Sequence, residues 1–328
     1  MNTRDSAPYD GLSPDRILDA LDSVGIRGDG RLLALNSFEN RVYQVWRDDA
    51  PPVVVKFYRP ARWTDAQIYE EHAFVAQLVE REIPAVPAMQ LAASTLNEFT
   101  GFRFAVYERC GGRAPDLDRR ETLVRIGRYV ARIHSVGAME PFKSRPALII
   151  DDFGVASRDY LLRHDFLPPD LRDVWHGVVD QALDGVRRAF ERAGAVAPLR
   201  LHGDCHGGNV LWTDAGAHFV DFDDARTGPA IQDLWMLLSG ERDSMEAQLT
   251  AVLEGYEDFR DFDRRELLLV EALRTLRLVH YCAWIARRWS DPAFPLAFPW
   301  FNTPRYWQDR ILELREQIAA MDEPPLQC

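Results

Sequence analysis

The hydrophobic pattern changes at Gly111-Gly112, and this change constrains the fold more than any other feature. Before the glycine pair, short runs of apolar and β-branched residues predict strands, at 32–47, 53–58 and 102–108. After it, apolar residues recur at helical spacing over 119–138, 168–193, 229–239, 243–258, 263–289 and 303–320. The order predicts an α+β chain of two lobes, a strand-rich lobe at 1–110 and a mainly helical lobe at 111–328.

Smaller signals place the remaining elements. Ser13 followed by Pro14 predicts the start of a helix that runs to about Gly25. The segment 63–82 predicts an amphipathic helix that opens at Thr64 or Asp65. Two short strands near 209–213 and 217–221 interrupt the helical part as a small hairpin.

Composition excludes several classes of protein. The formal charge is 39 − 51 = −12, so the chain as a whole has no electrostatic reason to bind nucleic acid or an anionic membrane. The four cysteines form no C-x-x-C pair, which is typical of a reducing cytosol. The N-terminus has no apolar core of a signal peptide, and no apolar run is long enough to span a bilayer. We expect a cytoplasmic monomer.

The stretch LHGDCHGGNV at 201–210 admits two interpretations. His202, Asp204 and His206 offer nitrogen and oxygen ligands, a set that zinc accepts. Against a zinc site, the other histidines are scattered and form no H-E-x-x-H motif. Alternatively, Asp204 and Asn209 form the catalytic loop of a phosphotransferase.

Spacing favours the phosphotransferase. The kinase template H-R-D-x-x-x-x-N places a proton-accepting Asp and a metal-binding Asn five residues apart, and here 209 − 204 = 5, with Gly203 replacing the Arg. Asp221 ends an apolar strand in HFVDFDDA, where kinases carry D-F-G. We therefore predict Asp204 and Asp221 as catalytic residues, with Asn209 and Asp221 as Mg²⁺ ligands.

The nucleotide side of the site is predicted upstream. Lys56 ends the run VVVK, as the phosphate-pairing Lys of kinases does. Glu71 should hold its ammonium, because Glu71 shares the register of the inward apolar residues, and Glu70 is the alternative. No G-x-G-x-x-G precedes Lys56, so Ser37 and Asn36 in the hairpin LNSFENRVYQV become the phosphate-contacting candidates. Backbone groups from Glu108 to Cys110 should meet the adenine.

These motifs and several longer segments carry a resemblance. LRLHGDCHGGNVLW, FVDFDDARTGPAIQDLWMLL, ALNSFENRVYQ, VVKFYRPARW and SDPAFPLAFPW resemble the aminoglycoside and choline kinase superfamily, in particular a branch of bacterial serine/threonine protein kinases. The resemblance spans about residues 10 to 326. It implies a bilobal protein-kinase-like fold with an antiparallel sheet in the N-terminal lobe, and ATP and Mg²⁺ as partners. It also implies that Asp233 braces the catalytic loop.

The sequence leaves two kinds of phosphate acceptor open, a small molecule and a protein. Asp221 and Asp233 are only 233 − 221 = 12 residues apart and no A-P-E follows, which favours a small and, given the acidic chain, cationic acceptor. The resemblance implies Ser or Thr of proteins, autophosphorylation and a role in a stress response. We expect the protein kinase; a small-molecule phosphotransferase and a nucleotide-binding pseudokinase are the alternatives. Phe298, Trp300 and Phe301 either fill the core or line the acceptor cleft.

Overall fold

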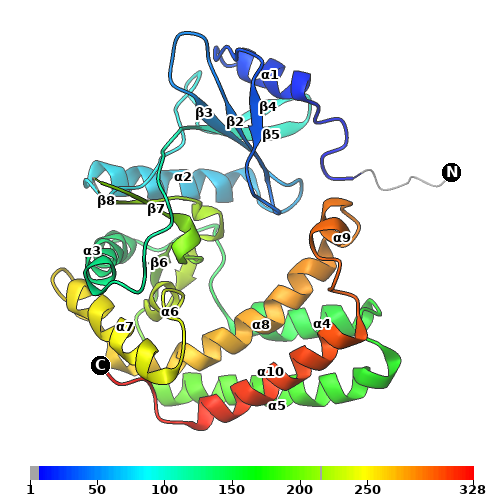
Figure 1. The fold of residues 1–328 in the computed structure, drawn as a ribbon, viewed down its shortest axis with the longest axis vertical. Coiled ribbons are helices and arrows are strands. Elements are labelled where there is room, and N and C mark those ends of the chain that lie inside the picture. The colour runs from blue at the N-terminus through cyan, green and yellow to red at the C-terminus, as the bar shows by residue number, and fades with distance from the viewer. Residues whose placement is uncertain (1–6, 215) are drawn as a thin grey trace. The chain divides into compact units, whose positions relative to one another are not determined.

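The computed structural model describes residues 7–214 and 216–328, which form two compact units. The first unit contains the chain up to Pro115 together with Phe142–Arg145 and Gly207–Ala225. The second contains Asp116–Pro141, Pro146–His206 and Arg226–Cys328. Strands dominate the first unit and helices the second (Figure 1), so the predicted α+β class is confirmed.

The first unit is built on a five-stranded antiparallel sheet in the order β1-β2-β3-β5-β4. Its strands are β1 (Leu32–Ala34), β2 (Arg41–Val45), β3 (Val53–Phe57), β4 (Asn97–Phe99) and β5 (Phe102–Glu108). The strands expected at 32–47, 53–58 and 102–108 are confirmed. β4 was not predicted; it turns into β5 through Thr100 and Gly101, which both have positive φ, as a two-residue hairpin turn requires.

Two helices of this unit pack on the sheet through separate apolar clusters (Figure 1). Helix α1 (Pro14–Asp22) begins after Ser13, whose hydroxyl accepts the N–H of Arg16, as predicted. Its apolar face joins Phe57 and Phe104 in one cluster. Helix α2 (Asp65–Glu80) begins after Thr64 and joins Ala105 in another cluster. Because neighbouring strand residues point to opposite faces, Phe104 and Ala105 show that the two clusters lie on opposite sides of the sheet.

The predicted hairpin at 209–221 is β7 (Val210–Thr213) and β8 (Gly216–Phe219), and it belongs to the first unit. Trp212 exchanges two backbone hydrogen bonds with Arg113, at 2.7 and 3.1 Å. The N–H of Phe219 donates to Pro84 at 2.8 Å. The hairpin is thereby tied to the preceding residues of its own unit.

The second unit is mainly helical. Its helices are α3 (Arg120–Gly137), α4 (Ala156–Arg163), α5 (Pro169–Ala193), α6 (Ile231–Trp235), α7 (Arg242–Tyr256), α8 (Val270–Arg287), α9 (Ala293–Ala297) and α10 (Pro304–Asp322), and β6 (Leu199–Leu201) pairs with β9 (Arg226–Gly228). The helices expected at 119–138, 168–193, 243–258 and 303–320 are present, whereas the one expected at 229–239 is shorter and covers only Ile231–Trp235. The single helix expected at 263–289 is wrong at its start, because Arg264–Leu269 forms a 3₁₀ helix before α8. Helices α4 and α9 were not predicted.

Two glycines let α3 and α7 approach unusually closely. A Cβ atom on Gly127 of α3 would lie 2.0 Å from the carbonyl oxygen of Val252. A Cβ atom on Gly255 of α7 would lie 1.9 Å from the carbonyl oxygen of Val124. The two helix backbones therefore touch where any side chain would separate them.

Among the described residues, no helix combines the length and the apolar character needed to cross a bilayer. The four cysteines are free thiols, and burial raises the pKa of Cys205 well above its ordinary value. A buried thiol with a raised pKa is a poor nucleophile.

Candidate active site

Lys56 lies among three carboxylates of the first unit. From β3, its Nζ atom is 2.9 Å from Asp223, 3.4 Å from Asp221 and 4.0 Å from Glu71. Burial alone would lower the pKa of Lys56, but these carboxylates outweigh burial and hold that pKa well above its usual value. Lys56 is therefore a cation that stays charged, and it lies beside Asp221, the residue predicted to bind metal.

The acidic partner on α2 is Glu71 and not Glu70. The Glu71 side chain is buried, and its carboxylate also lies 4.0 Å from Arg145. Burial raises the pKa of Glu71 even though Lys56 opposes the shift. Glu70 instead accepts the backbone N–H groups of Lys143, Ser144 and Arg145. The two adjacent glutamates therefore have different tasks.

Asn209 and Asp221 flank the same end of the β7–β8 hairpin. The carbonyl of Asn209 accepts the N–H of Val220 at 3.0 Å, and Asp221 is the next residue along the chain. Asp221 has left-handed backbone angles, φ 60° and ψ 62°, and 53% of its side chain is exposed. One amide and one accessible carboxylate at one hairpin end are oxygen donors of the kind that Mg²⁺ prefers, so these residues fit the predicted ion.

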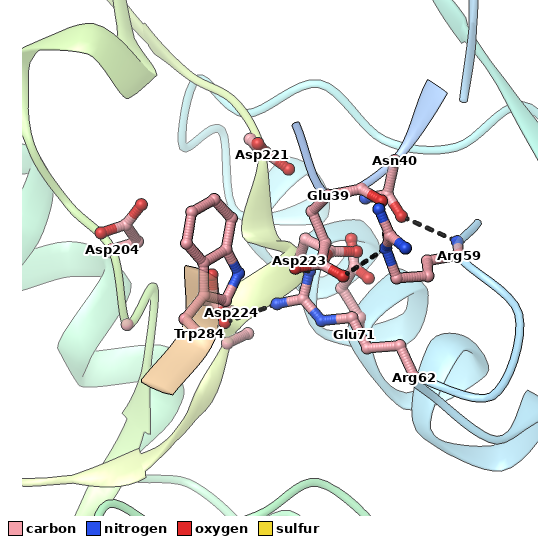
Figure 2. A network of polar contacts seen from close by, with 12 residues as sticks. Glu39, Asn40, Arg59, Arg62, Glu71, Asp204, Asp221, Asp223, Asp224 and Trp284 are labelled. Carbon is pink, nitrogen blue, oxygen red and sulfur yellow. Dashed lines mark hydrogen bonds and ion pairs between the residues drawn. The ribbon is translucent and has the colours of Figure 1, made fainter. Parts of the chain in front are cut away.

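A second group of charges surrounds Asp223, where kinases carry Gly. Arg62 lies 2.7 Å from Asp223, 2.9 Å from Asp224 and 3.3 Å from Glu39 (Figure 2). Glu39 also pairs with Arg59 at 3.0 Å. Burial raises the pKa of Asp223, but Arg62 and Lys56 outweigh it and hold that pKa below its usual range.

We call Glu39, Arg59, Arg62, Asp223 and Asp224 the arginine cluster. It joins the β1–β2 loop, the segment after β3 and the turn after β8 within one unit (Figure 2). Sequence reasoning missed both arginines, because arginines in a loop follow no periodicity. The only available signal was their position in RPAR, directly after the strand that carries Lys56.

The other nucleotide candidates lie at opposite ends of the strands, because Arg41 after the β1–β2 loop pairs with Phe57 whereas Glu108 pairs with Val53. Ser37 is half-buried in the β1–β2 loop, two residues before Glu39. Glu108 is exposed at the end of β5, and Cys110 follows it with a pKa that burial raises. Their nucleotide contacts remain predictions.

The loop of Asp204 lies in the second unit and is held by Asp233 of α6. The buried Asp233 carboxylate accepts the backbone N–H of His202 at 2.8 Å and that of Gly203 at 2.9 Å. It also lies 3.0 Å from the ring of buried His134. The brace implied by the family resemblance is therefore present.

Basic side chains of its own unit lie beside the Asp204 carboxylate. One oxygen lies 2.8 Å from Arg277 of α8, and the other lies 3.5 Å from the ring of His206. His202 is fully buried, with its Nδ1 atom 3.4 Å from the N–H of Asp204. In the part of the chain that the structure describes, no group of three or more His, Cys, Asp or Glu side chains is arranged to hold a metal, so the zinc interpretation gains no support.

Known proteins match the chain over most of its length. Residues 31–270 match the APH family, described as the phosphotransferase enzyme family. Stress response kinase A from Escherichia coli O157:H7 is 45% identical over 316 residues, 96% of this chain and 95% of that protein. Serine/threonine protein kinase RdoA from Salmonella typhimurium is 43% identical over the same shares. The whole-chain resemblance predicted from the sequence is confirmed.

Solved structures share the fold at lower sequence identity. Amicoumacin kinase hAmiN, in complex with AMP-PNP, Ca²⁺ and Ami, has a TM-score of 0.77 at 17% identity and covers 100% of this chain and 98% of its own. A microcompartment-associated aminopropanol kinase has a TM-score of 0.71 at 17% identity, with coverages of 94% and 97%. At this identity the likeness concerns the fold.

Proposed function

Because this chain belongs to the APH phosphotransferase family, with kinase chemistry supported by its named relatives, we propose that it is an ATP- and Mg²⁺-dependent serine/threonine protein kinase. The observation that carries the proposal is 43% identity, over 96% of the chain, to a protein named as a serine/threonine protein kinase. That likeness extends beyond the motifs that handle nucleotide. On the same basis we place the enzyme in the cytoplasm as a monomer with a role in stress response.

Lys56 binds the α- and β-phosphates of ATP in this proposal. Its ammonium is positioned by Glu71 and stays charged, because the surrounding carboxylates raise its pKa. Ser37 contributes from the β1–β2 loop, and the backbone from Glu108 to Cys110 receives the adenine. AMP-PNP, an ATP analogue, is bound in the complex of the structurally similar amicoumacin kinase.

Asn209 and Asp221 would hold Mg²⁺ through their side-chain oxygens. The ion would supply positive charge that neutralises the phosphates. The half-exposed Asp221 carboxylate would offer an oxygen to the ion. The Lys56 ammonium lies 3.4 Å from that carboxylate.

Asp204 orients the acceptor hydroxyl and accepts its proton. The acceptor oxygen bonds to the γ-phosphorus, the bond from that phosphorus to the β–γ bridging oxygen breaks, and ADP leaves. Asp233 keeps the loop in shape through the N–H groups of His202 and Gly203. Positioning of this kind is the main contribution that a protein makes to phosphoryl transfer.

A small-molecule acceptor is the second candidate. The solved structures of similar fold are named as kinases of amicoumacin and of aminopropanol. The 12 residues from Asp221 to Asp233 also leave little chain for a peptide-docking segment. The greater identity to the protein kinase relatives favours the first candidate.

Labelled ATP separates the candidates. Wild-type protein with Mg²⁺ should phosphorylate itself and myelin basic protein on Ser or Thr, and Asp204→Ala should lose at least about 10²-fold of that rate while it still binds ATP. Asn209→Ala should need more Mg²⁺ for the same rate. A panel of amino alcohols and aminoglycosides is tested in parallel. Label on a metabolite without phosphoserine or phosphothreonine would reject the protein kinase, and ATP binding without any turnover would favour the pseudokinase.

A further inference from the structure

Arg277 forms an ion pair with the carboxylate of Asp204, the proton acceptor of the proposed mechanism. Its guanidinium lies 2.8 Å from one oxygen of Asp204, and 45% of its side chain is exposed. The guanidinium fills a position beside the Asp204 carboxylate that an acceptor hydroxyl must approach.

Any acceptor that reaches Asp204 therefore lies close to the positive charge of Arg277. An acceptor cation would meet a like charge a few ångströms from the base, at a distance that salt does not screen. A carboxylate beside the acceptor hydroxyl would instead take up the guanidinium, since arginine binds carboxylates with strong, oriented hydrogen bonds. The net charge of −12 describes the whole chain, whereas this cation lies at the reacting atoms.

Helix α8 continues this surface away from Asp204. Arg277, Tyr281 and Trp284 follow at i, i+4 and i+7 and so share one face of the helix, while the intervening Val279 and Cys282 are buried. The Tyr281 and Trp284 rings lie with centroids 5.7 Å apart and planes 15° apart. The Trp284 ring also packs against Phe294 and Phe298, so the helix face next to the cation continues into an aromatic cluster.

We propose that Arg277 is a specificity-determining residue that selects acceptors with a carboxylate close to the acceptor hydroxyl, namely acidic peptides. The inference rests on the proposed kinase function, which requires an acceptor hydroxyl at Asp204. The Arg277–Asp204 ion pair is the reason to expect a negative charge on the acceptor. With the hydroxyl on Asp204, the carboxylate must lie within roughly 7 Å, which is about two residues of extended peptide. On binding, the acceptor carboxylate draws Arg277 from Asp204 and frees the base.

Matched peptides test the charge. Each carries one Ser, with Glu, Gln or Lys two residues away, and kcat/KM is measured with labelled ATP. Wild type should prefer Glu to Gln by about tenfold and Lys least. Arg277→Gln should erase the preference, and Arg277→Glu should reverse it in favour of Lys. Arg274→Gln is the control on the same helix, because Arg274 pairs with Glu271, and it should keep the wild-type order.

A purely structural Arg277 would give a different result. Arg277→Gln would then slow all three peptides equally and leave their order unchanged, which overturns the inference. Should wild type label no peptide, the kinase proposal fails separately. The charge preference is then measured on glycerate and 3-amino-1-propanol, and a preference of wild type for the cationic alcohol would refute the role of Arg277.

Discussion

At the scale of single residues, Asp223 pairs with two buried cations at once. Lys56 and Arg62 lie on its two oxygens at 2.9 and 2.7 Å, and all three side chains are largely buried. If Lys56 binds phosphate as we propose, the phosphate oxygens compete with Asp223 for its ammonium. Arg62 reduces that competition, because it supplies Asp223 with a second cation.

Removal of Arg62 should destabilise the protein. Arg62→Met leaves Asp223 short of a partner in a buried place, where such a loss costs about 3 kcal/mol of unfolding free energy. Urea denaturation of the full chain measures it. Arg103→Met is the control, because Arg103 pairs with the largely exposed Asp65, and it should cost at most about 1 kcal/mol. Equal losses in both variants would contradict the role given to Arg62.

Sequence reasoning reached some of these residues and not others. Lys56 and Glu71 were predictable, because a strand pattern and a helix register point them toward each other. Arg277 was not, since it lies 73 residues from Asp204 and only the fold brings the pair together. Glu39 and Arg62 stand in irregular segments, where no spacing indicates which side chains meet.

At the scale of elements, glycine decides how α3 and α7 pack. Gly127→Ala should destabilise the protein by about 3 kcal/mol or more, because its Cβ would fall 2.0 Å from a backbone oxygen and the helices must separate. Gly177→Ala is the matched control in the interior of α5, where a Cβ would meet nothing within 4 Å. It should stabilise the protein by up to about 1 kcal/mol. Thermal unfolding distinguishes the two signs, and a stabilising Gly127→Ala would show that the helices are free to part.

Helix α6, which carries Asp233, is held at its start by Glu266. The carboxylate of Glu266 accepts the N–H of Ile231 at 2.8 Å, and burial raises its pKa from 4.5 to about 7. The folded protein therefore keeps a proton that the unfolded chain releases above about pH 4.5. The stability from this proton is complete at low pH and is lost as the pH rises through about 7.

Glu266→Gln should remove this pH dependence. Between pH 4.5 and 7 the wild-type unfolding free energy should fall by roughly 3 kcal/mol relative to the variant, which keeps an oxygen for Ile231 but does not titrate. Urea denaturation at several pH values measures the difference. Parallel curves for the two proteins would show that Glu266 has an ordinary pKa.

The sequence predicted the helices and strands whose boundaries are set by nearby residues. α1 and α2 have capping side chains at their starts, Ser13 and Thr64, and these mark their boundaries. β4 is three residues long and has no buried position, so its pattern carries no signal. α4 follows a π-helical turn, Asp151–Val155, whose spacing disrupts the helical period.

At the scale of the whole molecule, the first unit is assembled from distant segments. Phe74 of α2 packs edge-on against Phe142 and Phe222, with ring centroids 5.5 and 6.1 Å away. Asp221 and Asp223, which neutralise Lys56, also come from the last segment. The first 115 residues therefore lack part of their own core and most of the charge that Lys56 needs.

A fragment of residues 1–115 should not fold to a native state. We expect it to bind the dye ANS and to lack the near-ultraviolet circular dichroism of fixed aromatic packing, as partly folded states do. The full chain under the same conditions is the comparison. A cooperative unfolding transition of the fragment would show that the later segments are dispensable for its core.

The discontinuity also has a consequence during protein synthesis. The last segment of the first unit ends at Ala225, so 225 − 115 = 110 further residues are translated after Pro115 before that unit is complete. At about 5–20 residues per second, this takes roughly 5 to 20 seconds. Until that segment is made, Phe74 lacks its contact with Phe222, and Lys56 lacks its ion pairs with Asp221 and Asp223. We therefore expect the opening third of this chain to need protection from aggregation during synthesis, because its unit is incomplete until Ala225 has been made.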